Sequence, residues 1–318
     1  MIKKLKKVFP FIILILFITF IYSFFKNNKN DFNFIYNLNI KIILEVIFLC
    51  FLYLITESII FKKITNYFNK DINIFSCFLI ICSTYLCNTF IQFSGLGFRA
   101  YYLKKIKQIN FTDFLLLSLF IILIEVFLFS GIGFLSLIIL DILNLEIRIS
   151  PIITIIIFFI FLSSLTIFFY YDKIYYFLIN LIKIQNFKYI KKISYFLEKI
   201  NKKKLRSFLL SFITLFFFQF SILFFIFYLG YSILEKENSI LFSIIATIST
   251  DLSFLFTFTP YAIGISEAFI FFSSYNFDIK IAEILFLTNF FRLSMFIVYF
   301  FLGWIYLYFF LKKFDNTK

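Results

Sequence analysis

Apolar stretches long enough to cross a lipid bilayer recur along this chain and constrain its fold more than any other feature. A transmembrane helix needs about 20 mostly apolar residues, and several runs reach that length. The apolar segments fall at 8–25, 38–61, 74–92, 113–140, 151–171, 207–234, 240–258, 261–274 and 281–311. Hydrophobic residues make up 62% of the 318 residues, whereas soluble domains contain roughly 45–50%. The sequence therefore predicts an all-α polytopic membrane protein, folded as a single integral membrane domain over residues 1–318.

Basic residues indicate how these segments are oriented, because Lys and Arg concentrate in cytoplasmic loops. The chain begins MIKKLKK before its first apolar segment, which predicts a retained signal anchor with a cytoplasmic N-terminus. Four further basic stretches lie at 62–73, 99–107, 172–206 and 312–318. All of them are cytoplasmic if the segments 74–97 and 240–274 enter and leave the membrane on the same side.

We therefore expect a multi-pass protein of the cell (inner) membrane with both termini in the cytoplasm. It would have about six spanning helices and two re-entrant segments. Re-entrant backbone is tolerated at membrane depth only where protein or a water-filled cavity covers it, so this topology implies an internal cavity. The alternative is two full spans in place of the re-entrant segments, giving about eight helices.

Residues 172–206 form a basic amphipathic segment. Apolar residues recur there at spacings of three and four, and basic residues occupy the other face. This pattern predicts a helix that lies in the membrane interface against anionic headgroups. A plain cytoplasmic loop rich in basic residues is an equally good interpretation.

Two short breaks interrupt the apolar pattern and concentrate the residues that weaken helices. One reads TFIQFSGLGFRAYY from Thr89, and the other reads TFTPYAIGISEAFI from Thr257. The chain has only 7 Gly and 3 Pro, and four of them fall in these two stretches: Gly95, Gly97, Pro260 and Gly264. Because glycine and proline interrupt helices, we expect a helix break in each stretch.

The two breaks lie 168 residues apart, and this offset predicts an internal repeat. The repeat halves would be 1–140 and 151–318, and the basic loops give them opposite orientations. The same offset maps 38–61 onto 206–229 and 113–140 onto 281–308, close to other apolar segments. Inverted repeats with broken helices near the membrane midplane are typical of secondary transporters.

Ionisable residues within the apolar segments are candidate functional groups, because a charge is costly to bury in a membrane. Arg99 and Glu267 lie at the two breaks, and Glu125 and Arg292 follow at similar spacings. We hypothesise that these four residues form a charge network around a central cavity. The arginines would bind an anionic phosphate, and the carboxylates would pair with them in the empty site and could carry coupling protons. The alternative is two salt bridges that only fix helix register.

Among the other acidic residues of the apolar segments, Asp251 lies in the second re-entrant segment and is a weaker candidate for a binding role. Glu45 follows Lys41 by four residues, so we expect these two to form a local pair. Glu57 lies near a membrane end beside a pair of lysines, and we expect its side chain to reach toward the interface.

Several classes of catalytic and binding site are excluded by what the sequence lacks. It has no His, which removes His-dependent triads, His metal sites and the commonest general base. The four cysteines lie in apolar runs without a CxxC pair, so we expect them to fill core space: Cys50, Cys77, Cys82 and Cys87. No P-loop or zinc motif occurs. We therefore expect no metal, no cofactor and no nucleic-acid partner.

The motifs at the two breaks resemble those of a known family. SGLGFRAYYLKK, the helix around Glu125, TPYAIGISEAF and NFFRLSMFIVYFFLG are similar to the flippase-like family. This family comprises the transmembrane region of lysylphosphatidylglycerol synthases and its stand-alone relatives. The resemblance covers roughly residues 10–311 and is clearest at 89–105 and 257–304. The order P-x-x-[IG]-G-x-x-E, followed by a helix with a central arginine, is its most specific element.

The resemblance implies a membrane protein that moves lipids between leaflets. We expect the substrate to be an anionic phospholipid or a polyprenyl-linked sugar phosphate. In the synthases a separate soluble domain transfers the lysyl group, and we expect no such domain and no enzymatic activity here. The alternative is a non-transporting partner that docks a lipid-modifying enzyme or a glycosyltransferase through residues 172–206.

Overall fold

The computed structural model describes residues 38–91, 93–142, 202–234, 239–253, 263–273 and 279–315. These residues form helices and short connections without strands. The helices are α2 (Ile40–Tyr67), α3 (Ile74–Phe90), α4 (Ser94–Lys107), α5 (Phe111–Ile142), α9 (Lys202–Ser232), α10 (Ser239–Ser253), α11 (Ile265–Ser273) and α12 (Ile281–Asp315). The predicted segments 8–25 and 151–171, and residues 172–201 of the basic amphipathic segment, lie outside the described residues.

Four of the described helices are long and apolar enough to cross a membrane: α2, α5, α9 and α12. The shortest of these helices, α2, has 28 residues. At 1.5 Å per residue it is about 42 Å long, which exceeds the hydrocarbon thickness of a bilayer. Large apolar side chains also cover the outer surface of the bundle. Trp304 and Phe309 on α12, for example, are 57% and 62% exposed. Water would not support such a surface, so the prediction of an all-α polytopic membrane protein is confirmed.

Helix ends follow from local capping chemistry. The side chain of Asn39 accepts a hydrogen bond from the Lys41 amide at 2.9 Å and begins α2, and Asn73 does the same for α3. These bonds satisfy amides that have no partner in the first turn of a helix. At the other end, α4 has three lysines in its last turn, where positive charge interacts favourably with the helix dipole.

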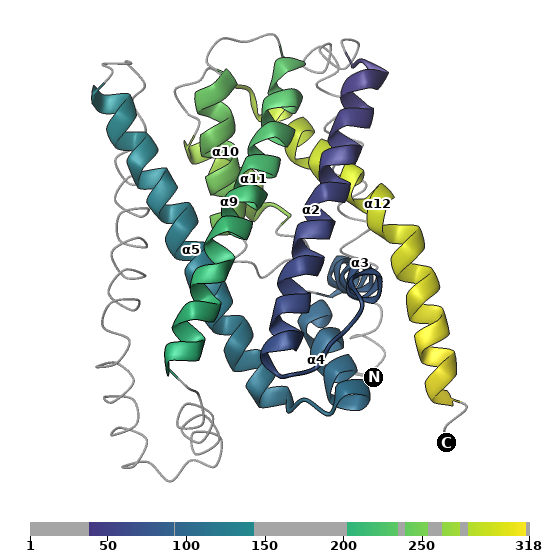
Figure 1. The fold of residues 1–318 in the computed structure, drawn as a ribbon. Coiled ribbons are helices and arrows are strands. Elements are labelled where there is room, and N and C mark those ends of the chain that lie inside the picture. The colour runs from purple at the N-terminus through teal and green to yellow at the C-terminus, as the bar shows by residue number, and fades with distance from the viewer. Residues whose placement is uncertain are drawn as a thin grey trace, which may run out of the picture.

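The described helices fall into two sets, and the helix lengths follow the same order in both. A long, a short, a short and a long helix follow one another as α2–α5 and again as α9–α12. Helices α2 and α9 pack side by side and run in opposite directions (Figure 1). Helices α5 and α12 lie apart on the two flanks of the bundle and also run in opposite directions. The last helix of each set packs against the first short helix of the other set, α12 on α3 and α5 on α10. The two sets are therefore interlocked.

The first break lies earlier in the chain than predicted. Helix α3 ends at Phe90, and Phe93 adopts a left-handed conformation with φ 61° before α4 begins at Ser94. Gly95 and Gly97 therefore lie in the first turn of α4 and not in the break. Gly95 permits close contact with α3 instead, since a Cβ atom there would lie 2.4 Å from the Thr84 carbonyl oxygen.

The second break contains a glycine whose conformation other residues rarely adopt. Gly264 has φ +86° and directly precedes α11. A positive φ of this size is accessible to glycine at little cost because it has no Cβ. Pro260, which was predicted to contribute to the same break, lies outside the described residues.

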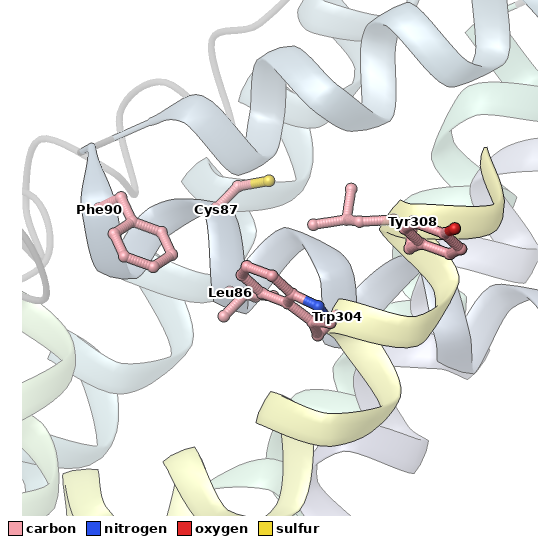
Figure 2. A pocket seen from close by; sticks show the side chains of 6 residues that line it. Leu86, Cys87, Phe90, Trp304 and Tyr308 are labelled. Carbon is pink, nitrogen blue, oxygen red and sulfur yellow. The ribbon is translucent and has the colours of Figure 1, made fainter. Parts of the chain in front are cut away.

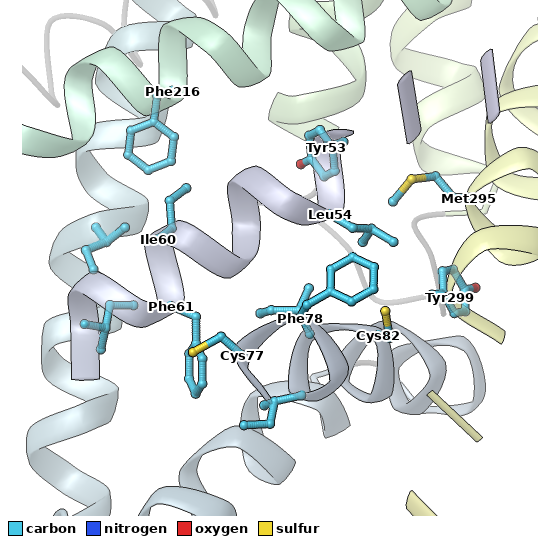
Figure 3. Packing of buried hydrophobic residues seen from close by; sticks show 14 of the residues in the cluster. Tyr53, Leu54, Ile60, Phe61, Cys77, Phe78, Cys82, Phe216, Met295 and Tyr299 are labelled. Carbon is cyan, nitrogen blue, oxygen red and sulfur yellow. The ribbon is translucent and has the colours of Figure 1, made fainter. Parts of the chain in front are cut away.

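The main core lies where α2, α3 and α12 meet (Figure 3). Tyr53, Leu54, Phe61, Phe78, Met295 and Tyr299 contribute large side chains to it. Cys50, Cys77 and Cys82 are fully buried as free thiols, and Cys87 is half-buried. Cysteine packs here as a small apolar side chain, as the sequence predicts. Glu45 also forms its predicted local pair with Lys41, with 3.9 Å between Oε1 and Nζ.

Gly303 brings α12 unusually close to α3, and its replacement should destabilise the protein. A Cβ atom at Gly303 would lie 2.7 Å from the Cys82 carbonyl oxygen, and Ser83 donates a hydrogen bond to the Gly303 carbonyl at 3.2 Å. We expect Gly303→Ala to lower the free energy of unfolding by about 1–3 kcal/mol, the usual effect of overpacking. Thermal unfolding in detergent measures this change.

Gly97→Ala is the matched control, because a Cβ atom at Gly97 would meet nothing within 4 Å. Replacing a helical glycine by alanine without a clash stabilises by roughly 0.5–1 kcal/mol. Equal unfolding midpoints for the two variants would contradict the close α3–α12 contact.

Candidate functional site

An ion pair between Glu57 on α2 and Arg99 on α4 lies inside the bundle. Nη2 of Arg99 is 3.9 Å from Oε2 of Glu57, and the side chains are only 17% and 13% exposed. Nε of Arg99 also donates to the Thr84 hydroxyl at 3.1 Å. That hydroxyl donates its own hydrogen to the Ile80 carbonyl, so its oxygen is free to accept. The fold of α4 back onto α3 positions Arg99 for both contacts.

The prediction for Glu57 was wrong. Its side chain points into the bundle, where Oε1 accepts a hydrogen bond from Nε2 of Gln219 on α9 at 2.9 Å. The neighbouring lysines have other partners: Lys62 pairs with Asp71 at 3.9 Å, and Lys63 donates to the Ser211 carbonyl at 3.0 Å. Glu57 therefore lies on the inner face of α2. Its partner is Arg99, which the sequence analysis expected to pair with Glu125 or Glu267.

Glu125 on α5 and Asp251 on α10 bring two more carboxylates to this region. The charge of Asp251 acts most strongly on Glu125, followed by those of Glu57 and Arg99. Glu57 also acts on Asp251. Helices α5 and α10 pack directly against each other, which explains how residues so far apart in sequence become neighbours. We call Glu57, Arg99, Glu125, Gln219 and Asp251 the central cluster.

A second group of polar residues joins the start of α11 to α12. Nη1 of Arg292 donates to Oε1 of Glu267, and Nη2 donates to Oε2 at 3.2 Å. Nη2 of Arg292 also donates to the Ser266 hydroxyl at 2.5 Å. The Gly264 amide donates to Oε2 of Glu267 at 2.8 Å and Thr288 to Oε1 at 3.2 Å. We call Ser266, Glu267, Thr288 and Arg292 the α11–α12 cluster.

Hydrogen-bond donors surround the carboxylate of Glu267. It accepts hydrogen bonds from Gly264, Ser266, Thr288 and Arg292, and its side chain is 11% exposed. Donors of this number and a bidentate guanidinium favour the charged form of a carboxylate. The environment of Glu267 therefore does not suit the role of proton carrier that the sequence suggested for it.

The four residues predicted to form one charge network, Arg99, Glu125, Glu267 and Arg292, have different partners in the structure. Arg292 and Glu267 form a pair, as hypothesised. Arg99 pairs with Glu57, and the charges of Asp251, Glu57 and Arg99 act on Glu125. Asp251, the weaker candidate, belongs to the central cluster.

Gln219 and Glu57 are the site residues that sequence reasoning missed. Gln219 carried a usable signal, because it is a lone amide in the apolar run LFFFQFSILFFIF. A polar side chain in such a run commonly contacts another helix.

A narrow apolar groove lies between α3 and α12 on the outer part of the bundle (Figure 2). Its volume is about 220 Å³, and its lining consists of Leu86, Cys87, Phe90, Trp304, Leu307 and Tyr308. Phe90 and Trp304 are 63% and 57% exposed, so the groove opens toward the surrounding lipid. Its chemistry suits a hydrocarbon chain and not a charged headgroup.

The Arg292–Glu267 pair should contribute strongly to stability when either partner is removed alone. We expect Arg292→Ala to lower the free energy of unfolding by about 3–5 kcal/mol, because it leaves a buried carboxylate without its cation. The double variant Arg292→Ala/Glu267→Ala should be less destabilised than the sum of the single variants. Thermal unfolding of the four proteins gives the coupling energy.

Lys41 and Glu45 provide the matched control for this cycle, since their side chains are 79% and 42% exposed. The same double-mutant cycle there should give a coupling of about 0.2–1 kcal/mol. Additive effects at Arg292 and Glu267 would show that the two side chains do not interact in the folded protein.

Comparison with known proteins identifies a family. The family described as lysylphosphatidylglycerol synthase TM region matches residues 8–303. A search of curated proteins and a search of solved structures each gave no significant match. The matched region spans most of the chain and includes both charge clusters. The chain therefore belongs to the family of lysylphosphatidylglycerol synthase transmembrane regions.

Proposed function

We propose that this protein moves lipids between the leaflets of the cell membrane, with both termini in the cytoplasm. The observation that carries this proposal is an intramembrane arginine, paired with a carboxylate, beside the helix break in each set of helices. Arg99 is on α4, just after the first break, and Arg292 on α12 holds Glu267 beside the second. The repeated order and opposite directions of the two sets support an inverted repeat (Figure 1). In transporters, such repeats place the substrate site near the membrane midplane, at the broken helices.

The substrate class that suits these groups is an anionic phospholipid or a polyprenyl-linked sugar phosphate. A guanidinium binds phosphate oxygens through a fork of N–H donors. A phosphate must first compete with the carboxylate that holds the arginine. The contact of Arg99 with Glu57 is longer than that of Arg292 with Glu267. Glu57 accepts a further hydrogen bond from Gln219, whereas Glu267 accepts further bonds from Gly264, Ser266 and Thr288. Arg99 is therefore the arginine that exchanges partners more readily.

The groove between α3 and α12 supports the lipid part of the proposal. Leu86 and Cys87 of the groove lie within three residues of Thr84, which binds Arg99. One short helix thus connects an apolar groove open to lipid with a polar cluster inside the bundle. This arrangement would let the acyl chains stay in hydrocarbon while the headgroup passes through the protein. The protein would act as a transporter, without chemical change to the lipid.

Loss of Arg99 should abolish most of the lipid movement. We expect Arg99→Ala to slow the movement at least about tenfold, equivalent to about 1.4 kcal/mol. The assay uses proteoliposomes with a fluorescent phosphatidylglycerol, and an impermeant quencher measures the fraction in the outer leaflet over time.

Lys41→Ala is the control, because it removes an exposed cation of a local pair. If Arg99→Ala is folded and moves lipid at the wild-type rate, the proposed role of Arg99 is wrong. If the wild-type protein moves no lipid of either class, a role in docking a lipid-modifying enzyme gains support.

The inverted repeat predicts opposite sidedness for two equivalent positions after the breaks. In a cysteine-free background, single cysteines replace Gln108 and Asn276. We expect an impermeant thiol reagent on whole cells to label position 276 and leave position 108 protected. Both become labelled after the cells are opened, which controls for reactivity. Equal labelling of the two positions on intact cells would exclude an inverted topology.

A further inference from the structure

Two donors from different sets of helices share the carboxylate of Glu57. Nε2 of Gln219 on α9 donates to Oε1 at 2.9 Å, whereas Nη2 of Arg99 on α4 lies 3.9 Å from Oε2. The first distance is that of a hydrogen bond, and the second is too long for one. Glu57 and Arg99 belong to the set α2–α5, and Gln219 belongs to the set α9–α12. Gln219 therefore holds Glu57 more closely than Arg99 does, across the interface between the two sets.

The side chain of Gln219 is unusually polar for its place in the fold. It lies in an apolar run of α9, where this helix packs against α2, and is 1% exposed. Among the residues that the structure describes, Oε1 has no hydrogen-bond partner. A buried acceptor without a partner is destabilising, and a leucine would fill a similar volume without this penalty. The described contact that compensates for the penalty is the bond from Nε2 to Glu57. The amide is therefore placed for Glu57 and not for packing.

Arg99 is positioned by contacts other than Glu57. Its Nε donates to the Thr84 hydroxyl on α3 at 3.1 Å. Its Cζ lies 6.0 Å from the ring centroid of Phe61, at the limit of a cation–π contact. Because Nε is bound to Thr84 and Nη2 makes no hydrogen bond to Glu57, the Nη end of the guanidinium is the part that can bind a phosphate.

The α11–α12 cluster shows the opposite arrangement. Thr288, a further donor to Glu267, lies on α12 itself, four residues before Arg292. It therefore holds the carboxylate where this arginine hydrogen-bonds to it. Gln219 and Arg99, in contrast, lie on different helices. A donor on another helix can hold a carboxylate away from its cation.

We propose that Gln219 is a positioning residue that keeps Glu57 from hydrogen-bonding to Arg99, so that the Nη atoms of Arg99 stay available to a phosphate. When α9 moves relative to α2, the bond from Gln219 is lost, Glu57 closes on Arg99 and the anion is released. The interface between the two sets thereby controls the affinity of Arg99 for its ligand. Only hydrogen bonds and ion pairs are exchanged in this step. The inference rests on the proposed lipid transport only for the identity of the anion.

Double-mutant cycles on the stability of the full-length protein in detergent test this role without any lipid movement. The cycle of Arg99→Ala and Glu57→Gln measures the coupling within this pair. We expect the coupling to increase in a Gln219→Leu background, because Glu57 is then free to bind Arg99. The expected increase is about tenfold in the equilibrium constant of unfolding, which corresponds to about 1.4 kcal/mol. Equal or weaker coupling in that background would overturn the proposal.

Ser221→Ala is the matched control on the same helix. Ser221 is exposed, and its hydroxyl donates to the Phe217 carbonyl of its own helix, so the coupling between Arg99 and Glu57 should not change in this background. Gln219→Asn replaces Gln219→Leu if the latter does not fold. Its shorter amide cannot reach Glu57 in the same way, and the coupling should rise here as well. Unchanged coupling in the folded Gln219→Asn protein would refute the positioning role.

Lipid binding connects this role to the proposed function. Trp304 is the only tryptophan of the chain and lines the groove between α3 and α12. Quenching of its fluorescence by brominated phosphatidylglycerol in phosphatidylcholine nanodiscs therefore measures the preference for the anionic lipid. We expect Gln219→Leu to lower this preference about tenfold and to have no further effect in a Glu57→Gln background. A loss of equal size in both backgrounds would show that Gln219 acts on packing alone, against the proposal.

The two measurements separate this inference from the proposed function. Increased coupling in Gln219→Leu, with no preference for phosphatidylglycerol in the wild type, would support the positioning of Glu57 and contradict the proposed anion. A preference that is lost in Arg99→Ala and unchanged in Gln219→Leu would support the proposed function and overturn the role of Gln219.

Discussion

An ionised side chain within an apolar bundle needs protein groups to replace the water that it loses, and this requirement explains how the short helices of this protein are placed. Arg99 reaches its partners only because α4 folds back on α3, with Gly95 allowing the contact with Thr84. Glu267 lies in the first turn of α11, where a backbone amide adds to the donors from α12. Each arginine is thus compensated at a helix break, where the chain can bring several polar groups together.

The long helices provide a rigid frame for these breaks. Because α12 packs on α3 and α5 packs on α10, a movement of one set of helices must displace a short helix of the other. The contact at Gly303 makes the first of these interfaces especially close. In the proposed transport, opening of a path for lipid would therefore involve both sets together. Such a coupled arrangement fits a transporter that exposes one site to each side in turn.

Sequence reasoning located elements well and side-chain partners less well. The segments predicted at 38–61, 207–234 and 281–311 correspond to α2, α9 and α12, because a run of apolar residues specifies a spanning helix by length alone. The partner of Arg99 could not be read in the same way. A helix that is apolar on all sides carries no periodic signal that shows which face is buried, so Glu57 was assigned to the wrong environment. The position of the first break differed because Phe93, and not a glycine, adopts the left-handed conformation.

The sequence by itself determined that this is a helical membrane protein and that similar breaks, one with Arg99 and one with Glu267, occur twice. These properties follow from composition, length and spacing along the chain, and they need no knowledge of contacts. Only the tertiary structure decided that Glu57 pairs with Arg99, that Asp251 joins Glu125, and that Gln219 leaves an acceptor unpartnered among the described residues. These residues come from helices α2, α4, α5, α9 and α10. Their proximity depends on how helices rotate and cross, which is fixed by the packing of the whole bundle and not by any local stretch of sequence.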